Sequence, residues 1–515
     1  MNYKKLGGIL GKIMICEGAL MLLPLIVAII YREDLWHILS FAIPMAALAI
    51  FGALLQIPKP RREELYQKEA FALVGAVWIV MSLFGAIPFV INRDIPSLVD
   101  AFFEITSGFT TTGASIINDI TLLSHSSLFW RSFSHWIGGM GILVFVLIFI
   151  PEGKDGSSMH LLRAESPGPQ VGKITSKMKV TASILYLIYI GLTVIQIVLL
   201  MLDAPIVGHE SDKFFFSLLT AFGTAGTGGF GFLPGSMELM NPFSQYVIAI
   251  FMLLFGVNFS LYYLLLIGKI KQIFKSSEFR LYGLLVASSI AIIFISLITR
   301  FQAFPQVYTT EEAFRHSLFQ VASIMTTTGF STTDFGTWPT IAIAVLAIIM
   351  LIGAMAGSTG GGIKVSRIGI SAKGIYVNFR KLINPRYVPK VKYEDKPLEE
   401  KMISSVFSFI TLYFFIILCS AFLLSFDPIN GTMVAISSDA YSDGYSVIHD
   451  FSTNLSASLS CISNIGPGFG AVGPYSSFAG YSIFSKILLS FVMIIGRLEI
   501  LPVFVLFNPR TWKKS

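Results

Sequence analysis

The chain alternates between long apolar runs and short polar segments. The first two apolar runs, residues 8–31 and 38–57, are separated by a short polar loop and followed by a charged stretch at 58–69. Each run is long enough to cross about 30 Å of hydrocarbon at ~1.5 Å per residue. This pattern predicts a leading transmembrane hairpin.

After the hairpin, one pattern recurs in four copies. Each copy has a long apolar run, a short amphipathic stretch, a polar loop that contains glycine, and a second apolar run. The amphipathic stretches are too short to cross a bilayer, so they predict re-entrant half-helices. The first runs cover 70–92, 178–202, 280–300 and 402–426, and the half-helices cover 97–109, 213–224, 311–325 and 451–462. In the first copy the second run follows Trp130, and in the other three copies it covers 241–267, 338–356 and 482–507.

A polar loop follows each half-helix. Residues 110–113 and 326–329 both read T-T-T-G, whereas 225–230 read A-G-T-G-G-F and 463–468 read S-N-I-G-P-G. Non-helical backbone in a membrane must be buried in protein or line a wet path, because lipid cannot satisfy its amides. Four such loops around one axis predict a ring of carbonyl groups that replaces the hydration shell of a monovalent cation. The expected filter residues are Thr111, Thr112, Gly113, Thr227, Gly228, Thr327, Thr328, Gly329, Asn464, Ile465 and Gly466, with the glycines at 113, 228, 329 and 466 in equivalent places.

Two features of the second apolar runs suggest control of a pathway. Arg497 lies in I-I-G-R-L-E-I of the last run, and a cation inside a membrane span is costly and usually functional. It is either a barrier to a permeating cation or a structural partner for an acid or for carbonyl groups. Residues 353–362 are rich in glycine and would break the third repeat's second helix near its midpoint, as a gate or as an exit turn. The expected gate residues are Gly357, Ser358, Thr359, Gly360, Gly361 and Gly362.

Composition and charge support a membrane protein with cytoplasmic ends. The chain is 54% hydrophobic and 13% charged, with a mean hydropathy of +0.73. Its net charge of +7 comes mostly from alternate loops, including 151–179 and 364–401, so it reflects the positive-inside bias and not nucleic-acid binding. The basic loop 364–401 is either a docking surface for a regulatory partner or a surface that attracts anionic membrane lipid.

The sequence holds no catalytic motif that we recognise. Residues 357–364, G-S-T-G-G-G-I-K, fail the Walker spacing because Ile363 separates Gly362 from Lys364. Three cysteines form neither a metal spacing nor a disulfide framework. A membrane enzyme is therefore not expected.

The motifs together resemble the Trk/Ktr/HKT superfamily of potassium-translocating membrane subunits, and its TrkH branch most closely. The resemblance rests on T-T-T-G-A-S at 110–115, H-W-I-G-G-M-G-I at 135–142, R-A-E-S-P-G-P at 163–169, G-V-N-F-S-L-Y-Y at 256–263, T-T-T-G-F-S-T at 326–332, G-S-T-G-G-G-I-K at 357–364 and G-R-L-E-I at 496–500. It implies four M1-P-M2 units (helix, re-entrant pore helix, helix) around one pore in each subunit of a homodimer. It also implies a separate cytosolic nucleotide-binding subunit of the TrkA type, a gate at 353–362 and a constriction at Arg497. Glycine at Gly113, where sodium transporters of the family carry serine, favours potassium.

The sequence thus predicts an all-α polytopic protein of a bacterial inner membrane, a leading hairpin followed by four M1-P-M2 repeats around a central pore. Its predicted function is potassium uptake through the four-loop filter, with potassium as the bound ion; the alternative is a sodium- or proton-coupled symporter, or a sodium-permeable transporter of the same fold. The predicted divisions are 1–57 (hairpin), 58–150, 151–267 and 268–363 (units one to three), 364–401 (basic cytosolic loop) and 402–515 (unit four).

Overall fold

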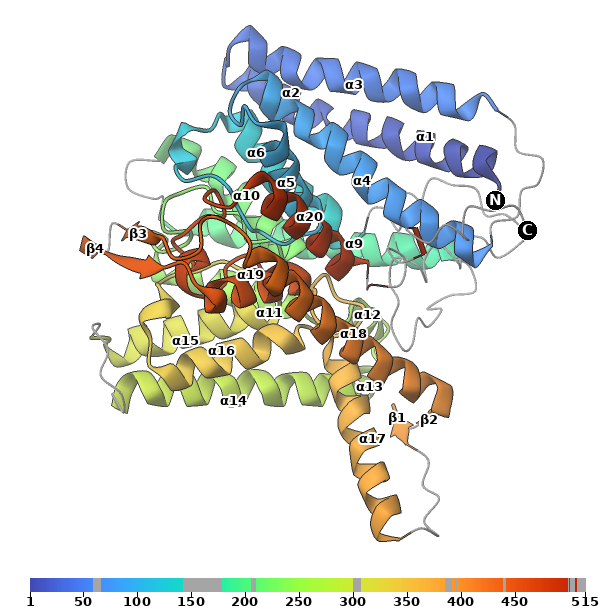
Figure 1. Cartoon of the computed structure of the whole chain (residues 1–515), viewed down its shortest axis with the longest axis vertical. Helices are drawn as coiled ribbons and strands as arrows, with labels where there is room; N and C mark the ends of the chain where they lie inside the picture. The colour runs from blue at the N-terminus through green and yellow to red at the C-terminus, as the bar shows by residue number, and fades with distance from the viewer. Residues whose placement is uncertain are drawn as a thin grey trace.

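Long helices surround a buried centre built from short helices and loops (Figure 1). The computed structural model describes residues 1–58, 66–141, 178–204, 210–299, 307–384, 391–394, 396–438, 441–498, 500 and 505–506. Six helices in this part of the chain are long and apolar enough to cross a membrane, or seven if the bent pair described below counts as one span. The protein is therefore a multi-pass, largely helical membrane protein, as predicted.

The leading hairpin consists of α1 (Tyr3–Leu20), α2 (Leu22–Ile30) and α3 (Leu35–Gln56). Helices α1 and α3 approach closely where two glycines face each other: a Cβ on Gly11 would lie 2.4 Å from the carbonyl oxygen of Gly52. A Cβ on Gly52 would lie 2.6 Å from the carbonyl oxygen of Gly11. Small residues of this kind let helix backbones pack directly against each other within a membrane.

The same order of a long helix, a short helix and a second helix then recurs four times. The short helices have 12 to 16 residues, so they span at most about 24 Å and cannot cross a bilayer. Their starts are set locally; for example, Thr309 and Glu312 form a capping box. The long first helices are α4 (Gln67–Ile91), α9 (Met178–Leu202), α14 (Ser277–Thr299) and α18 (Glu400–Leu424), and the short helices are α5 (Leu98–Phe109), α10 (Lys213–Gly226), α15 (Thr310–Met325) and α19 (Phe451–Ser463).

The second helices are shorter than the sequence suggested. The run 241–267, predicted as one span, is bent by 93° between α11 and α12, and this prediction was wrong. The bend follows Gly256, and the side chain of Asn258 then caps the new helix by accepting from the Ser260 N–H at 2.9 Å. In the fourth unit the helix ends at Arg497, and the predicted end at residue 507 lies outside the described residues. The second helices are α6 (His125–Gly139), α11 (Pro242–Phe255) with α12 (Phe259–Leu266), α16 (Thr340–Ile352) and α20 (Ile483–Arg497).

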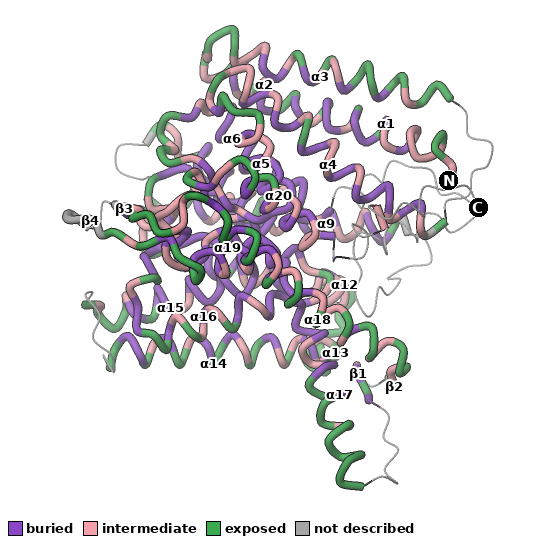
Figure 2. The backbone as a smooth tube through the Cα atoms, in the orientation of Figure 1, coloured by how far each residue is buried: buried purple, intermediate pink, exposed green. Residues whose placement is uncertain are grey.

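The basic segment 364–401, predicted as a loop, begins with a helix. Helix α17 (Val365–Ile383) projects away from the body of the molecule, and its far end is exposed (Figures 1 and 2). A small hairpin, β1 (Lys392–Tyr393) with β2 (Lys396–Pro397), packs near its start. The predicted boundary at 401/402 falls inside α18, and the boundary at 150/151 lies outside the described residues.

A second hairpin interrupts the all-helical pattern in the fourth unit. Strands β3 (Met433–Ser438) and β4 (Tyr441–Ile448) pair antiparallel, with Met433 opposite Ile448. The remaining elements in the described part of the chain are α13 (Ile270–Lys275) and the short 3-10 turns Ile120–Leu122, Glu210–Asp212, Phe335–Thr337 and Gly470–Val472.

The core lies where the short helices meet. One apolar cluster joins the leading hairpin to units one, two and four, and a second is formed largely by unit three. Figure 2 shows that burial is densest around α5, α10 and α19. The ends of the short helices are thus held in the most tightly enclosed part of the molecule.

Candidate functional site

All four short helices end in one backbone motif. The residue after the helix, or one further on, takes the left-handed conformation, with φ between 53° and 58° at Thr111, Thr227, Thr327 and Asn464. Its N–H bonds to the carbonyl group three residues earlier, and the next N–H bonds to the carbonyl five residues earlier. This is the Schellman arrangement, which turns the chain sharply out of the helix. The longer bonds join 112 to 107 (2.8 Å), 228 to 223 (2.9 Å), 328 to 323 (2.8 Å) and 465 to 460 (3.0 Å).

Two residues beyond each left-handed residue stands a glycine with positive φ. In unit two this glycine is Gly229, at φ +72°, and not Gly228. The predicted equivalence of Gly228 with Gly113 was therefore wrong by one residue; Gly228 corresponds to Thr112 instead. Two adjacent glycines in unit two made the alignment of its loop with the other loops ambiguous. Aligning the loops on their left-handed residues, with Thr227 opposite Thr111, identifies Gly229 as the counterpart of Gly113. The positive-φ glycines are Gly113, Gly229, Gly329 and Gly466.

The four loops close into a ring, which we call the loop ring (residues 111–113, 227–229, 327–329 and 464–466). Each of these glycines lies against the carbonyl oxygen that precedes the glycine of a neighbouring loop. A Cβ on Gly113 would meet the Gly228 oxygen at 2.0 Å, and one on Gly229 would meet the Thr328 oxygen at 1.9 Å. A Cβ on Gly329 would meet the Ile465 oxygen at 2.0 Å, and one on Gly466 would meet the Thr112 oxygen at 2.7 Å, which returns to the first loop.

The hydroxyl groups of the loop ring fall into two sets. Thr110 and Thr112 share a hydrogen bond of 2.8 Å, and Asn464 donates to the Thr112 Oγ1 at 2.9 Å, so these side chains fix the backbone from behind. The hydroxyl of Thr111 is also fully buried, but it has no hydrogen-bond partner among the residues that the structure describes. A buried hydroxyl without a partner needs a ligand such as water or a cation. The four helix C-termini add partial negative charge at the same place.

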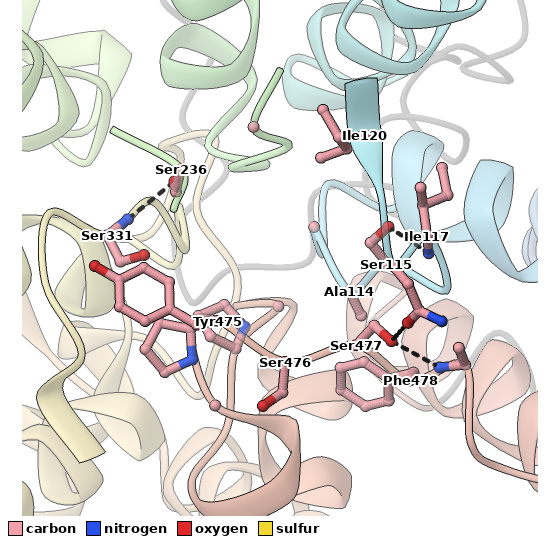
Figure 3. Close-up of a pocket in the computed structure, with 18 of the residues that line it drawn as sticks. Ala114, Ser115, Ile117, Ile120, Ser236, Ser331, Tyr475, Ser476, Ser477 and Phe478 are labelled. Atoms are coloured by element: carbon pink, nitrogen blue, oxygen red, sulfur yellow. Dashed lines mark hydrogen bonds between the residues drawn. The ribbon is translucent and has the colours of Figure 1, made fainter. Parts of the chain in front are cut away.

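A cavity of about 520 Å³ opens on one side of the loop ring. Its lining includes Gly113, Gly229, Gly329 and Gly466 and the segments that follow the loops. Hydrogen bonds between units hold its wall together: Ser331 donates through its N–H to Ser236 Oγ at 3.2 Å, and Ser477 donates to Asn118. Figure 3 shows Ser477 and Phe478 beside Ala114 and Ser115, where the Phe478 N–H donates to the Ser115 carbonyl at 2.8 Å, and Tyr475 nearer to Ser331.

A buried ion pair supports the first loop from outside the ring. Arg131 on α6 lies 2.7 Å from Glu104 on α5, and both side chains are at most 1% exposed. Glu104 also accepts from the Ile116 N–H at 2.9 Å, and Arg131 donates to the carbonyl of Gly231 at 3.3 Å. The pair therefore positions the segments that follow two neighbouring loops. This pairing was not predicted from the sequence; the available signals were Arg131, a single arginine in α6, and Glu104, one of two carboxylates in α5.

The 353–362 loop lies on the opposite side of the loop ring from the cavity. The Gly361 N–H donates to Thr327 Oγ1 at 2.6 Å, and a Cβ on Gly361 would lie 2.3 Å from the Ser463 oxygen. Of the predicted gate residues, Thr359, Gly360, Gly361 and Gly362 are buried, whereas Gly357 is exposed and Ser358 is half-buried. The loop thus places its glycines directly against the ring.

Arg497 joins three units below the ring. Its guanidinium donates to the carbonyls of Gly138 (2.5 Å) and Gly139 (2.8 Å) at the end of α6. It also donates to the carbonyl of Thr359 in the 353–362 loop at 2.8 Å. Arg497 therefore binds carbonyl groups, which is one of the predicted alternatives. The same contacts hold its positive charge next to the ring, so they are compatible with the other alternative, a barrier.

Comparisons with known proteins agree on the family of this chain. A family model described as "TrkH: Cation transport protein" matches residues 37–514. The "Trk system potassium uptake protein TrkH" of Salmonella typhimurium is 32% identical over 100% of both chains. The "Trk system potassium uptake protein TrkG" of Escherichia coli is 31% identical over 96% of this chain and 95% of its own. The crystal structure of the potassium transporter TrkH from Vibrio parahaemolyticus matches with a TM-score of 0.83 at 28% identity and covers 100% of each chain. These relatives are transporters and not enzymes.

Proposed function

Because the chain belongs to the TrkH family of cation transport proteins, we propose that it carries potassium ions into the cell through the loop ring. The membrane is a bacterial inner membrane, and both termini are cytoplasmic, as the basic loops indicate. A potassium ion enters the cavity lined by the four glycines and exchanges its water for carbonyl oxygens of the ring. The membrane voltage drives it inward, with about 2.3 kcal/mol per charge per 100 mV.

One observation carries this proposal: four unequal sequences share one backbone geometry and close into a ring. Carbonyl oxygens of Thr112, Gly228, Thr328 and Ile465 each lie beside the glycine of a neighbouring loop. The hydroxyl of Thr111 and the helix C-termini suit a monovalent cation at the same place. The bound species is the transported potassium ion, and no further cofactor is needed.

The 353–362 loop and Arg497 are proposed to close the inner side of the ring. Gly361 lies against Thr327 and Ser463, so an ion leaving the ring meets this loop first. Arg497, held by three carbonyl oxygens, repels a cation at the same level. Transport then requires the loop to move, which a cytosolic nucleotide-binding subunit of the TrkA type would control. We also propose that the chain forms a homodimer in the lipid bilayer.

Cation uptake into proteoliposomes tests the proposal. The purified chain is reconstituted with an inside-negative voltage, and the uptake of potassium, rubidium, sodium and lithium is compared. Gly113→Ser should relax the preference for potassium and rubidium, because its Cβ meets the Gly228 oxygen at 2.0 Å. Gly191→Ser is the matched control, since a Cβ there meets no atom within 4 Å. Equal uptake of all four cations by the unaltered chain would remove the proposal.

Coupled transport is the second candidate. Sodium that accelerates potassium uptake, or a pH gradient that drives it without voltage, would indicate a symporter of the same fold. Competition between sodium and potassium for entry would instead indicate a shared, weakly selective ring.

A further inference from the structure

A carboxylate from a neighbouring helix holds the 353–362 loop at the end opposite Arg497. Glu278, in the first turn of α14, accepts a hydrogen bond from the Ala356 N–H at 2.7 Å. Its side chain is 6% exposed. The Ala356 N–H is part-buried, and an ionised carboxylate that accepts from a backbone N–H makes one of the stronger hydrogen bonds in a protein. This contact therefore fixes where the loop starts.

A second carboxylate holds that end of α14 in turn. Glu394, at the turn of the β1–β2 hairpin, accepts from Ser276 Oγ at 3.0 Å and from the Glu278 N–H at 3.1 Å. Glu394 thus caps the N-terminus of α14 although it lies 116 residues after Glu278 in the chain. Glu278 thus links the hairpin to the loop.

The same hairpin also contacts the helix that follows the loop. Lys373 on α17 donates to the Lys392 carbonyl at 3.1 Å and lies 5.8 Å from the centre of the Tyr393 ring. Tyr393 is 4% exposed and packs with Ile370 of α17. The hairpin therefore grips both α14, which anchors the loop, and α17, which continues from it.

We propose that Glu278 is a positioning residue that keeps the 353–362 loop against the ring, and that the cytosolic β1–β2 hairpin acts on the loop through Glu278. The inference rests on the proposed function, in which this loop obstructs the pathway. Displacing the hairpin, or removing either carboxylate, frees the Ala356 end of the loop and favours the open arrangement.

Uptake by the reconstituted chain without any partner protein is the first test. Glu278→Ala and Glu394→Ala should each raise potassium uptake about tenfold, which corresponds to ~1.4 kcal/mol. Glu278→Gln, which keeps a side-chain oxygen for the Ala356 N–H, should stay close to the unaltered chain. Glu400→Ala is the matched control, because it removes an exposed carboxylate from the start of α18. The preference for potassium over sodium should not change in any of them.

Labelling of the loop is the second test and does not depend on transport. Ser358→Cys, at a half-buried position of the loop, is treated with a thiol reagent, and the signal of the chain's own three cysteines is subtracted. Adding Glu278→Ala should increase the labelling rate of this cysteine severalfold. Unchanged uptake together with unchanged labelling would overturn the proposal. If the unaltered chain takes up sodium as readily as potassium, the proposed function is wrong. The labelling would still decide the role of Glu278.

Discussion

Replacing Glu104 or Arg131 alone should destabilise the fold strongly, whereas replacing both residues together should cost less than the two single losses added. Both side chains are at most 1% exposed, so removing one leaves a buried charge without its counter-ion. Such a loss costs about 3–5 kcal/mol of folding free energy. The cost of Arg131→Met should lie near the upper end of this range, because Glu104 then keeps only the Ser115 hydroxyl and the Ile116 N–H as hydrogen-bond donors. Glu104→Gln should fall near the lower end, because Arg131 keeps its contact with the Phe230 ring at 4.2 Å.

The double variant decides whether this reasoning is right. If the charges act as a pair, Glu104→Gln with Arg131→Met should cost about 2–3 kcal/mol, well below the sum of about 8 kcal/mol expected for independent sites. The free energy of unfolding is measured in mixed micelles by denaturant titration for the four proteins of the cycle. Potassium preference is measured on the same preparations, since the pair positions the segments that follow the loops. Additive losses, or single losses below about 1 kcal/mol, would refute the argument.

Three further predictions concern the loop ring, Arg497 on its inner side and the leading hairpin. Gly229→Ala should abolish selective potassium uptake, because its Cβ would lie 1.9 Å from the Thr328 oxygen at a φ of +72°; ion competition assays measure this. Arg497→Gln should raise potassium uptake without a partner, since the amide carries no charge and releases part of its hold on Thr359, and flux under fixed voltage measures this. Gly52→Leu should lower the melting temperature of the purified protein without changing ion preference, because overpacking at the α1–α3 contact costs ~1–3 kcal/mol or more.

The sequence predicted the elements whose limits are set locally. The short helices begin and end within about two residues of their predicted limits, because caps such as Ser97 and Asp450 and the loop glycines lie beside them in the chain. The long first helices follow from uninterrupted apolar runs, which need no knowledge of their neighbours. Family membership likewise followed from short motifs.

The errors came from features that depend on contacts between units. The run 241–267 is long and largely apolar, which predicted a single span although Gly256 and the capping residue Asn258 were visible in it. The correct choice of Gly229 over Gly228 needed the backbone angle at Thr227. The contact between Glu278 and Ala356 joins a helix to a loop 78 residues further along the chain, which no periodicity reveals.

The unequal sequences of the four loops follow from their unequal surroundings. Each loop needs the same Schellman turn and the same glycine, because the ring closes only with this backbone. What supports each turn differs: the second loop packs Gly228 against the ring of His135, where a Cβ would lie 2.2 Å from that ring. The fourth loop uses Asn464, whose amide donates to the Thr112 hydroxyl and, at 3.0 Å, to the Met493 carbonyl. A threonine could not donate both bonds, since its hydroxyl has a single hydrogen to donate. Departures from T-T-T-G are therefore required by the neighbours of each loop, and they leave the carbonyl ring unchanged.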